Sequence, residues 1–196
     1  MVAPVGRPEG DAAGREGGGG RCAYQGAPGA FSHEACTDLR PWDEAVAYAG
    51  FAEAIAAVQS GEAGCALIPV ENTTIGRIEP AAGLVETSGL RLVSEVWRPM
   101  RLALMACDGA SLRSVRTAES HPVALRQCLG SLKAMGLEPV EAFDTAGAAQ
   151  GVAEAQDPTR AAVAPVRAAE VYGLTVLRAD IHDNPDNRTR FVLLSL

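Results

Sequence analysis

Short apolar runs alternate with amphipathic segments along residues 21–179. The run "CALIPV" (65–70) is continuously apolar, as in a buried strand, whereas "FAEAIAAVQS" (51–60) repeats its apolar positions at helical spacing and stops at Gly61. By these criteria strands are expected at 21–25, 44–49, 65–70, 90–97, 100–107, 114–118, 138–143, 160–164 and 174–179, and helices at 31–39, 51–60, 78–89, 121–136, 144–155 and 166–173. This alternation with short connections predicts an α/β fold in which helices flank mainly parallel sheets.

The two halves of the pattern are joined by long extended segments near residues 90–107. Two similar strand–helix halves connected in this way predict two lobes. Ligands of such folds sit in the crevice at the carboxyl ends of the strands. The first 20 residues, rich in Gly, Pro and charge, lack the apolar centre of a signal peptide and predict a flexible tail outside the fold.

Charge and cysteine content narrow the function classes. The formal charge of −7 leaves no basic footprint for nucleic acid, although local arginines can still bind a small anion. No apolar run approaches the length of a membrane span. The five cysteines are scattered without a CxxC pair, which favours reduced thiols in a cytoplasm, and the three histidines have no metal-ligand spacing.

Polar segments next to the predicted strands are the candidates for a site. They are "GAPGAFS" (26–32), "ENTTIGR" (71–77), "SHP" (120–122), "DTAGAA" (144–149) and "DNPDNRTRF" (183–191). Ser32, Ser120 and either Asp144 or Thr145 can be explained as helix caps alone. The residues by themselves predict a two-lobed α/β protein with a polar cleft, and they do not identify a reaction.

Six segments, taken together and in order, resemble the catalytic domain of prephenate dehydratase and of its relative arogenate dehydratase. They are "YQGAPGAFSHEA", "ALIPVENTTIG", "SHPVALRQC", "DTAGAA", "AAEVYGL" and "NRTRFVLL", and the match covers residues 21–196. The resemblance implies a cytoplasmic carbon–oxygen lyase of phenylalanine biosynthesis that converts prephenate, a small anionic cyclic substrate, to phenylpyruvate. It further implies no metal or organic cofactor and a homodimer.

The resemblance also implies a fold like that of periplasmic binding proteins, with the active site between the lobes. The terminal strand is expected to return to the first lobe and bring its TRF motif to the cleft. The lobes would then comprise 21–98 with 181–196, and 99–180.

The family's TRF threonine corresponds to Thr189, to which the resemblance assigns a catalytic hydrogen bond to the departing hydroxyl. Arg190 would bind a substrate carboxylate or orient Thr189, although a structural ion pair is the alternative for Arg190. Asn72 and Thr73 match the family's EN[ST] motif and would hydrogen-bond the substrate.

Two further hydroxyls and one cation complete the expected site. Ser120 and Thr145 stand at predicted helix starts and would add donors. Arg77 replaces a small residue of the family pattern and would recognise a further carboxylate or replace a missing anion contact.

Several positions depart from the family pattern, and we interpret them as a sign of an altered pocket. They are Arg77, Arg101 and Leu102, Ala82 and Gly83, Val123, and Pro165. Two other functions therefore stay open. One is a dehydratase-like enzyme of specialised metabolism that acts on another cyclic acid or decarboxylates prephenate without aromatisation, and the other is a non-catalytic binding module. The retained Thr189 favours dehydration.

The printed sequence stops at Leu196, directly after the TRF strand. We therefore expect neither the regulatory ACT domain that often follows in this family nor allosteric inhibition by phenylalanine.

Overall fold

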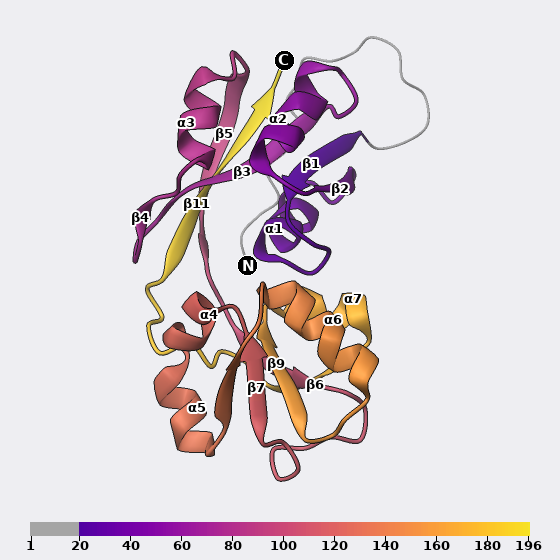
Figure 1. The fold of residues 1–196 in the computed structure, drawn as a ribbon. Coiled ribbons are helices and arrows are strands. Elements are labelled where there is room, and N and C mark those ends of the chain that lie inside the picture. Colours follow the sequence, from indigo (N-terminus) through magenta and orange to yellow (C-terminus); the bar gives the residue numbers. More distant parts are fainter. Residues whose placement is uncertain (1–19) are drawn as a thin grey trace.

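The computed structural model describes residues 20–196, so the tail predicted for residues 1–20 lies outside the described residues except for Gly20. Two lobes, each a sheet with helices packed on it, stand one above the other (Figure 1). The predicted α/β architecture of two lobes is confirmed. No helix of the described chain is long and apolar enough to cross a membrane.

The first lobe is a six-stranded sheet in the order β2-β1-β3-β11-β5, with β4 paired to β3. Its elements are β1 (Arg21–Gln25), α1 (Phe31–Leu39), β2 (Glu44–Tyr48), α2 (Phe51–Gln59), β3 (Cys65–Asn72), β4 (Gly76–Arg77), α3 (Ala81–Thr87), β5 (Arg91–Pro99) and β11 (Arg188–Ser195). Strand β1 runs parallel to β2 and β3, whereas β11 is antiparallel to both β3 and β5.

The second lobe is a five-stranded sheet in the order β10-β6-β9-β7-β8. Its elements are β6 (Ala103–Ala106), β7 (Thr117–Ser120), α4 (Pro122–Gln127), α5 (Leu129–Met135), β8 (Glu138–Glu141), α6 (Thr145–Ala155), β9 (Arg160–Ala164), α7 (Val166–Tyr172) and β10 (Thr175–Arg178). Strand β7 is parallel to β8 and β9, while β6 is antiparallel to β9 and β10. Both sheets are therefore mixed, and the prediction of mainly parallel sheets was wrong.

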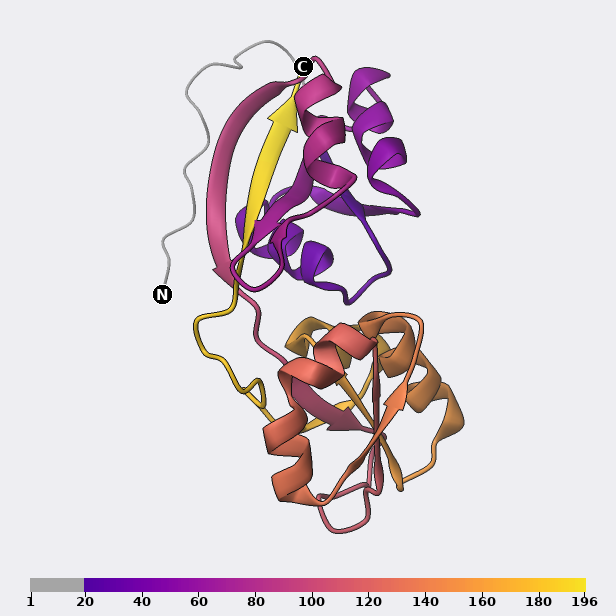
Figure 2. The same ribbon diagram turned by 60° about the vertical axis from the view of Figure 1, so that its left-hand side comes forward.

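Strand β11 is the return of the chain from the second lobe to the first. Its run Phe191–Leu194 is buried between β3 and β5, as expected for an apolar segment in the middle of a sheet. Figure 2 shows this strand rising through the first lobe beside the curved β5. The exact lobe boundaries, 21–98 with 181–196 and 99–180, stay a prediction, which the membership of the two sheets supports.

Three local predictions near the cleft need correction. The helix expected at 121–136 is two helices, because the chain leaves helical geometry at Cys128 (φ −119°, ψ 8°). The strand expected at 114–118 runs from Thr117 to Ser120, so Ser120 ends a strand and His121 is the helix N-cap. Ser32 lies inside α1 and caps nothing, whereas Asp144 caps α6 as predicted.

The lobes meet on the side of α1 and α7. The Tyr172 hydroxyl donates a 2.8 Å hydrogen bond to the Pro28 carbonyl. Beside it, Gly29 has φ +90°, and a Cβ atom at this position would lie 2.9 Å from Cα of Ala168. Only glycine combines that backbone conformation with so close an approach. This contact closes one side of the space between the lobes.

The side chain of His33 supports the same turn, and we expect its protonation to lower the stability of the fold in mild acid. Its Nδ1 accepts a 2.9 Å hydrogen bond from the Gly29 N–H. Burial, assisted by the nearby Arg167, lowers the pKa of His33 below its ordinary value. As the pH falls, His33 of the unfolded chain therefore becomes protonated before His33 of the folded chain. The free energy of unfolding should start to fall below about pH 6.5, and it should continue to fall until the pH is below the pKa of His33 in the folded protein.

Urea unfolding at pH 7.5 and 5.5 tests this effect. We expect wild type to lose more stability between these values than the variant His33→Gln, which has no imidazole to protonate. Equal losses in the two proteins would mean that His33 is not the responsible group.

Candidate functional site in the interlobe cleft

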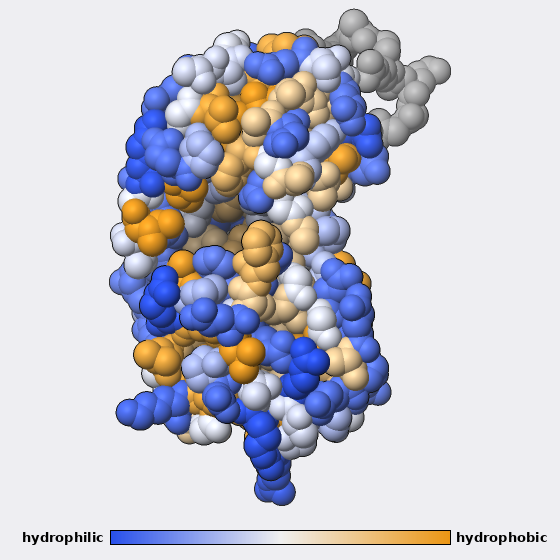
Figure 3. All heavy atoms as spheres, viewed as in Figure 1, coloured by the Kyte–Doolittle hydropathy of each residue, from blue (hydrophilic) through white to orange (hydrophobic). Residues whose placement is uncertain are grey.

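A cavity of about 270 Å³ lies between the lobes, where the space-filling view shows a hollow (Figure 3). We call it the cleft cavity. Both lobes and the segments that join them line it, through Phe31, Asn72, Ile75, Ile78, Met100, His121, Val123, Ala124, Gln127, Asp144, Thr145, Asn187 and Thr189. Its size is close to the lower end of the range for small-molecule sites.

The register of β3 and β11 brings Asn72 and Thr189 together. They are directly paired in the antiparallel ladder and therefore share one face of the sheet. Asn72 Nδ2 donates to Thr189 Oγ1 at 2.9 Å, and Thr189 is only 4% exposed. No acceptor for the Thr189 hydroxyl proton occurs among the described residues, which leaves this proton free to point into the cavity.

The orientation of the Asn72 amide follows from its neighbours. Its Oδ1 accepts from the N–H groups of Thr74 and Ile75, at 2.8 and 3.2 Å. Its Nδ2 therefore has to be the group that faces Thr189, the Arg188 carbonyl and Asn187 Oδ1. The loop after β3 thus fixes Thr189 Oγ1 as an acceptor from Asn72.

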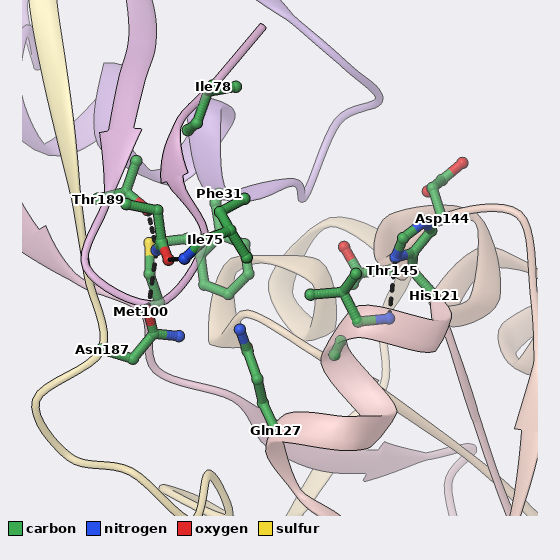
Figure 4. A pocket seen from close by; sticks show the side chains of 13 residues that line it. Phe31, Ile75, Ile78, Met100, His121, Gln127, Asp144, Thr145, Asn187 and Thr189 are labelled. Atoms are coloured by element: carbon green, nitrogen blue, oxygen red, sulfur yellow. Dashed lines mark hydrogen bonds between the residues drawn. The ribbon is translucent and has the colours of Figure 1, made fainter.

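Asn187 is held by the same network. Its Oδ1 accepts from Asn72 Nδ2 at 2.9 Å and from Thr74 Oγ1 at 3.2 Å. Its Nδ2 is buried and has no acceptor among the described residues. In Figure 4 this nitrogen is turned toward Gln127 on the opposite lobe. An unmatched buried donor of this kind is costly and is a candidate contact for a ligand.

The second lobe supplies the opposite wall (Figure 4). His121 caps α4 by accepting the Val123 N–H at Nδ1, so a neutral His121 carries its proton on Nε2. The backbone carbonyl of Gln127, at the end of α4, accepts the Asp183 N–H, whereas its side-chain amide has no hydrogen-bond partner within residues 20–196. Thr145 begins α6, where Asp144 Oδ1 accepts the Gly147 N–H at 2.6 Å.

Two further cavities adjoin the cleft cavity. One, of about 620 Å³, lies along the turn 25–32 and shares Phe31, Asp144 and Thr145 with it. The other, of about 320 Å³, we call the annex; it is lined by Thr74, Ile75, Val123, Arg126, Gln127, His182, Asp183, Asn184 and Asn187. The cleft therefore has room for a ligand with more than one polar end.

Three of the seven predicted site residues line the cleft cavity, namely Asn72, Thr145 and Thr189. Thr73 does not line it. Its hydroxyl donates to the Asp186 carbonyl and accepts the Arg188 N–H, and so holds the segment that carries Thr189. Ser120 is fully buried and donates to the Val163 carbonyl at 2.6 Å, which ties β7 to β9 beneath the cleft.

The two predicted arginines lie away from the cavity. Arg190 is next to Thr189 on the strand, so it points to the opposite face of the sheet. There it pairs with Glu71 and Glu95, each at 3.0 Å, in agreement with the alternative of a structural ion pair. Arg77 is exposed and contacts Glu79 and Glu86. The structure therefore does not bring either guanidinium to a ligand in the cavity.

Among the departures from the family pattern, Val123 alone lines the cleft cavity. Leu102 and Ala82 are buried in the hydrophobic cores of the two lobes, and Pro165 is the N-cap of α7. Because only one of these positions lines the cavity, their interpretation as a sign of an altered pocket is weakened, and with it the case for an altered substrate.

Sequence analysis gave no role to Gln127, Asn187 or His121. The spacing along the sequence could have indicated Gln127 and Asn187. Asn187 lies two residues before Thr189, the spacing that puts two side chains on the same face of an extended chain. Gln127 lies four residues after Val123, one helical turn further on. Within residues 20–196 no group of three or more His, Cys, Asp or Glu side chains could hold a metal ion.

A family model described as prephenate dehydratase matches residues 22–196. The chain is 39% identical over 173 residues to a bifunctional N-acyl-homoserine lactone acylase/prephenate dehydratase of Komagataeibacter europaeus, covering 88% of this chain and 62% of that protein. It is also 39% identical over 175 residues to arogenate dehydratase 2 of Petunia hybrida, covering 89% of this chain and 44% of that one. The chain thus spans only part of the length of these relatives.

Solved structures give the same result. One of a prephenate dehydratase from Arthrobacter aurescens, in complex with L-Phe, has a TM-score of 0.80 and 29% identity over 89% of this chain and 60% of that one. Another, described as GqqA, a novel type of quorum quenching acylase, has a TM-score of 0.83 and 39% identity over 89% of this chain and 63% of that one.

Proposed function

Because the chain belongs to the prephenate dehydratase family, we propose that it converts prephenate to phenylpyruvate, with arogenate as a possible second substrate. The family match over residues 22–196 and the cavity between the lobes, which has both polar and apolar side chains in its wall, support this proposal. The reaction takes up one proton and releases water and carbon dioxide from the prephenate dianion. The departing hydroxyl needs a hydrogen-bond donor, and the departing carboxylate needs a site that does not stabilise its charge.

The proposal rests on the observation that no described residue accepts the hydroxyl proton of Thr189. Asn72 donates to Oγ1, so the Thr189 hydroxyl can direct its own hydrogen only away from Asn72. We assign to Thr189 the hydrogen bond to the leaving hydroxyl, which strengthens as the C–O bond breaks and negative charge grows on that oxygen. Thr145 and His121 on the opposite lobe are proposed to bind a polar group of the substrate other than the departing hydroxyl and carboxylate.

The apolar part of the cleft cavity suits the carboxylate that is lost. Phe31, Ile75, Ile78 and Met100 line the cavity beside Thr189. No Lys or Arg is among the residues that line this cavity. A carboxylate with no counter-ion beside it gains little stabilisation before the reaction, and this favours its loss as neutral carbon dioxide.

An assay of the purified protein with prephenate and with arogenate tests the proposal. Phenylpyruvate from prephenate, or phenylalanine from arogenate, is the expected product. A non-aromatic keto acid would indicate the decarboxylase alternative, and binding without turnover would indicate a non-catalytic module. An N-acyl homoserine lactone belongs in the same assay, because the Komagataeibacter relative is described as an acylase of such lactones as well as a prephenate dehydratase.

The cellular setting is a further proposal. The cysteines, Cys22, Cys36, Cys65, Cys107 and Cys128, are all free and buried, which supports a reducing compartment such as the cytoplasm. Several plant relatives are chloroplastic.

We also propose a homodimer, for which the exposed Leu92 and Trp97 on the edge strand β5 are a candidate surface. Light scattering would show the mass of the assembly.

A further inference from the structure

The proposed substrate is a dianion, yet the cleft cavity has no cation on its walls. The ring carboxylate leaves as carbon dioxide, but the side-chain carboxylate persists into the product and needs a counter-ion. Among the three cavities described above, Arg126 is the only Lys or Arg in a wall, and it belongs to the annex.

The annex opens from the cleft cavity across four residues that line both: Ile75, Val123, Gln127 and Asn187. A ligand whose ring lies beside Thr189 can therefore extend one arm past Asn187 into the annex. Its volume of about 320 Å³ is more than a short oxo-acid side chain requires.

Arg126 is available for a ligand. It lies at the exposed side of α4, and no carboxylate pairs with it within residues 20–196. Asp183, the one acidic residue in the annex wall, is already engaged by the start of α5. Its oxygens accept from the Gly130 N–H at 2.8 Å and from the Ser131 N–H and hydroxyl at 3.1 and 3.2 Å.

Asn187 supplies a second, independent sign of a missing ligand. It is 3% exposed, and its Nδ2 has no acceptor among the described residues. The Oδ1 of the same amide is fixed by Asn72 and Thr74, so the amide cannot turn to hide its donor. A carboxylate oxygen at the junction of the two cavities would provide the acceptor that Nδ2 lacks.

We propose that the annex binds the side-chain carboxylate of the substrate, with Arg126 as its counter-ion and Asn187 Nδ2 as a hydrogen-bond donor. The inference rests on the proposed function and specifies which end of the substrate enters which cavity. The ring then lies with its hydroxyl at Thr189 and its ring carboxylate against the apolar wall. Since the side-chain carboxylate is unchanged by the reaction, Arg126 binds the substrate and the transition state equally well. It therefore lowers KM and has little effect on kcat.

The variant Arg126→Gln tests the proposal. Its control is Arg113→Gln, which also removes one positive charge but lies on an exposed loop outside the three cavities. We expect KM for prephenate to rise about tenfold in Arg126→Gln, the effect of losing one charged hydrogen bond, with kcat within about twofold of wild type. Arg113→Gln should match wild type, and Arg126→Lys should recover part of the loss. An unchanged KM in Arg126→Gln would overturn the proposal.

Phenylpyruvate distinguishes the two carboxylates, because it retains the side-chain carboxylate and has lost the ring carboxylate. Its dissociation constant, measured by calorimetric titration, should rise in Arg126→Gln by the same factor as KM. A rise in KM without weaker phenylpyruvate binding would place Arg126 at the ring carboxylate and contradict the proposal. A wild-type protein that forms no product from prephenate would contradict the proposed function instead, and the titration would still test the annex.

Discussion

Replacing Thr189 with alanine is expected to lower kcat for phenylpyruvate formation by about two to three orders of magnitude. The variant removes the one hydroxyl whose proton is directed into the cavity by the Asn72 amide. Because the hydrogen bond to the leaving oxygen strengthens mainly as the bond breaks, KM should change by no more than a few fold. Steady-state kinetics with prephenate measure both constants.

The control for this prediction is Thr189→Ser, which retains the hydroxyl and should keep kcat within about tenfold of wild type. Thermal unfolding of both variants would show whether the buried position tolerates the change. A folded Thr189→Ala protein with wild-type kcat would exclude Thr189 as the donor to the leaving group.

The second large effect is expected for Asn72→Asp, a nearly isosteric change that replaces the amide donor with a carboxylate at a buried position. The introduced carboxylate accepts hydrogen bonds and cannot donate them. The hydroxyl of Thr189 and the amide of Asn187 would both turn toward it, away from the substrate. We therefore expect kcat to fall at least as far as in Thr189→Ala. The Arg188 carbonyl loses the donor from Asn72 but keeps the Thr73 N–H, so the loss of this hydrogen bond costs about 0.5–1 kcal/mol of stability.

Asn72→Ala is the informative comparison. It also removes the acceptor for the N–H groups of Thr74 and Ile75, so it should destabilise the fold more than Asn72→Asp does. It leaves the Thr189 proton free, however, and so should retain more activity. Asn72→Ala would then be the less stable but the more active of the two variants. If Asn72 only maintained the fold, urea unfolding and kcat would rank them in the same order.

The apolar pattern was sufficient to predict most strands and helices and the division into two lobes. It did not predict strand direction, because a buried apolar run such as 65–70 reads the same in parallel and antiparallel neighbours. The break at Cys128 had no Gly or Pro to mark it. Ser120 was assigned as a cap because serine commonly caps helices, yet its hydroxyl instead donates to Val163 on the neighbouring strand β9, which is far away in the sequence.

The same limit separates the predicted site residues that line the cleft cavity from those that do not. Thr189 and Asn72 lie in short motifs, and pairing of adjacent strands brings motifs of this kind together. Arg190 pairs with glutamates of β3 and β5, and Arg77 pairs with Glu86 of α3 in addition to its near neighbour Glu79; no local pattern indicates the partners on other elements. A charged residue beside a motif is thus a weak predictor of a ligand contact until its neighbours in space are known.

The position of β11 also has a consequence for biosynthesis of the chain. The second sheet uses residues 103–178 and can form as soon as they leave the ribosome, whereas the first sheet has β11 between β3 and β5. The first lobe must therefore wait, with the apolar edges of two strands unpaired, until residues 188–195 are synthesised. Since those residues also carry Thr189, a nascent chain cannot complete the cavity before they have been synthesised.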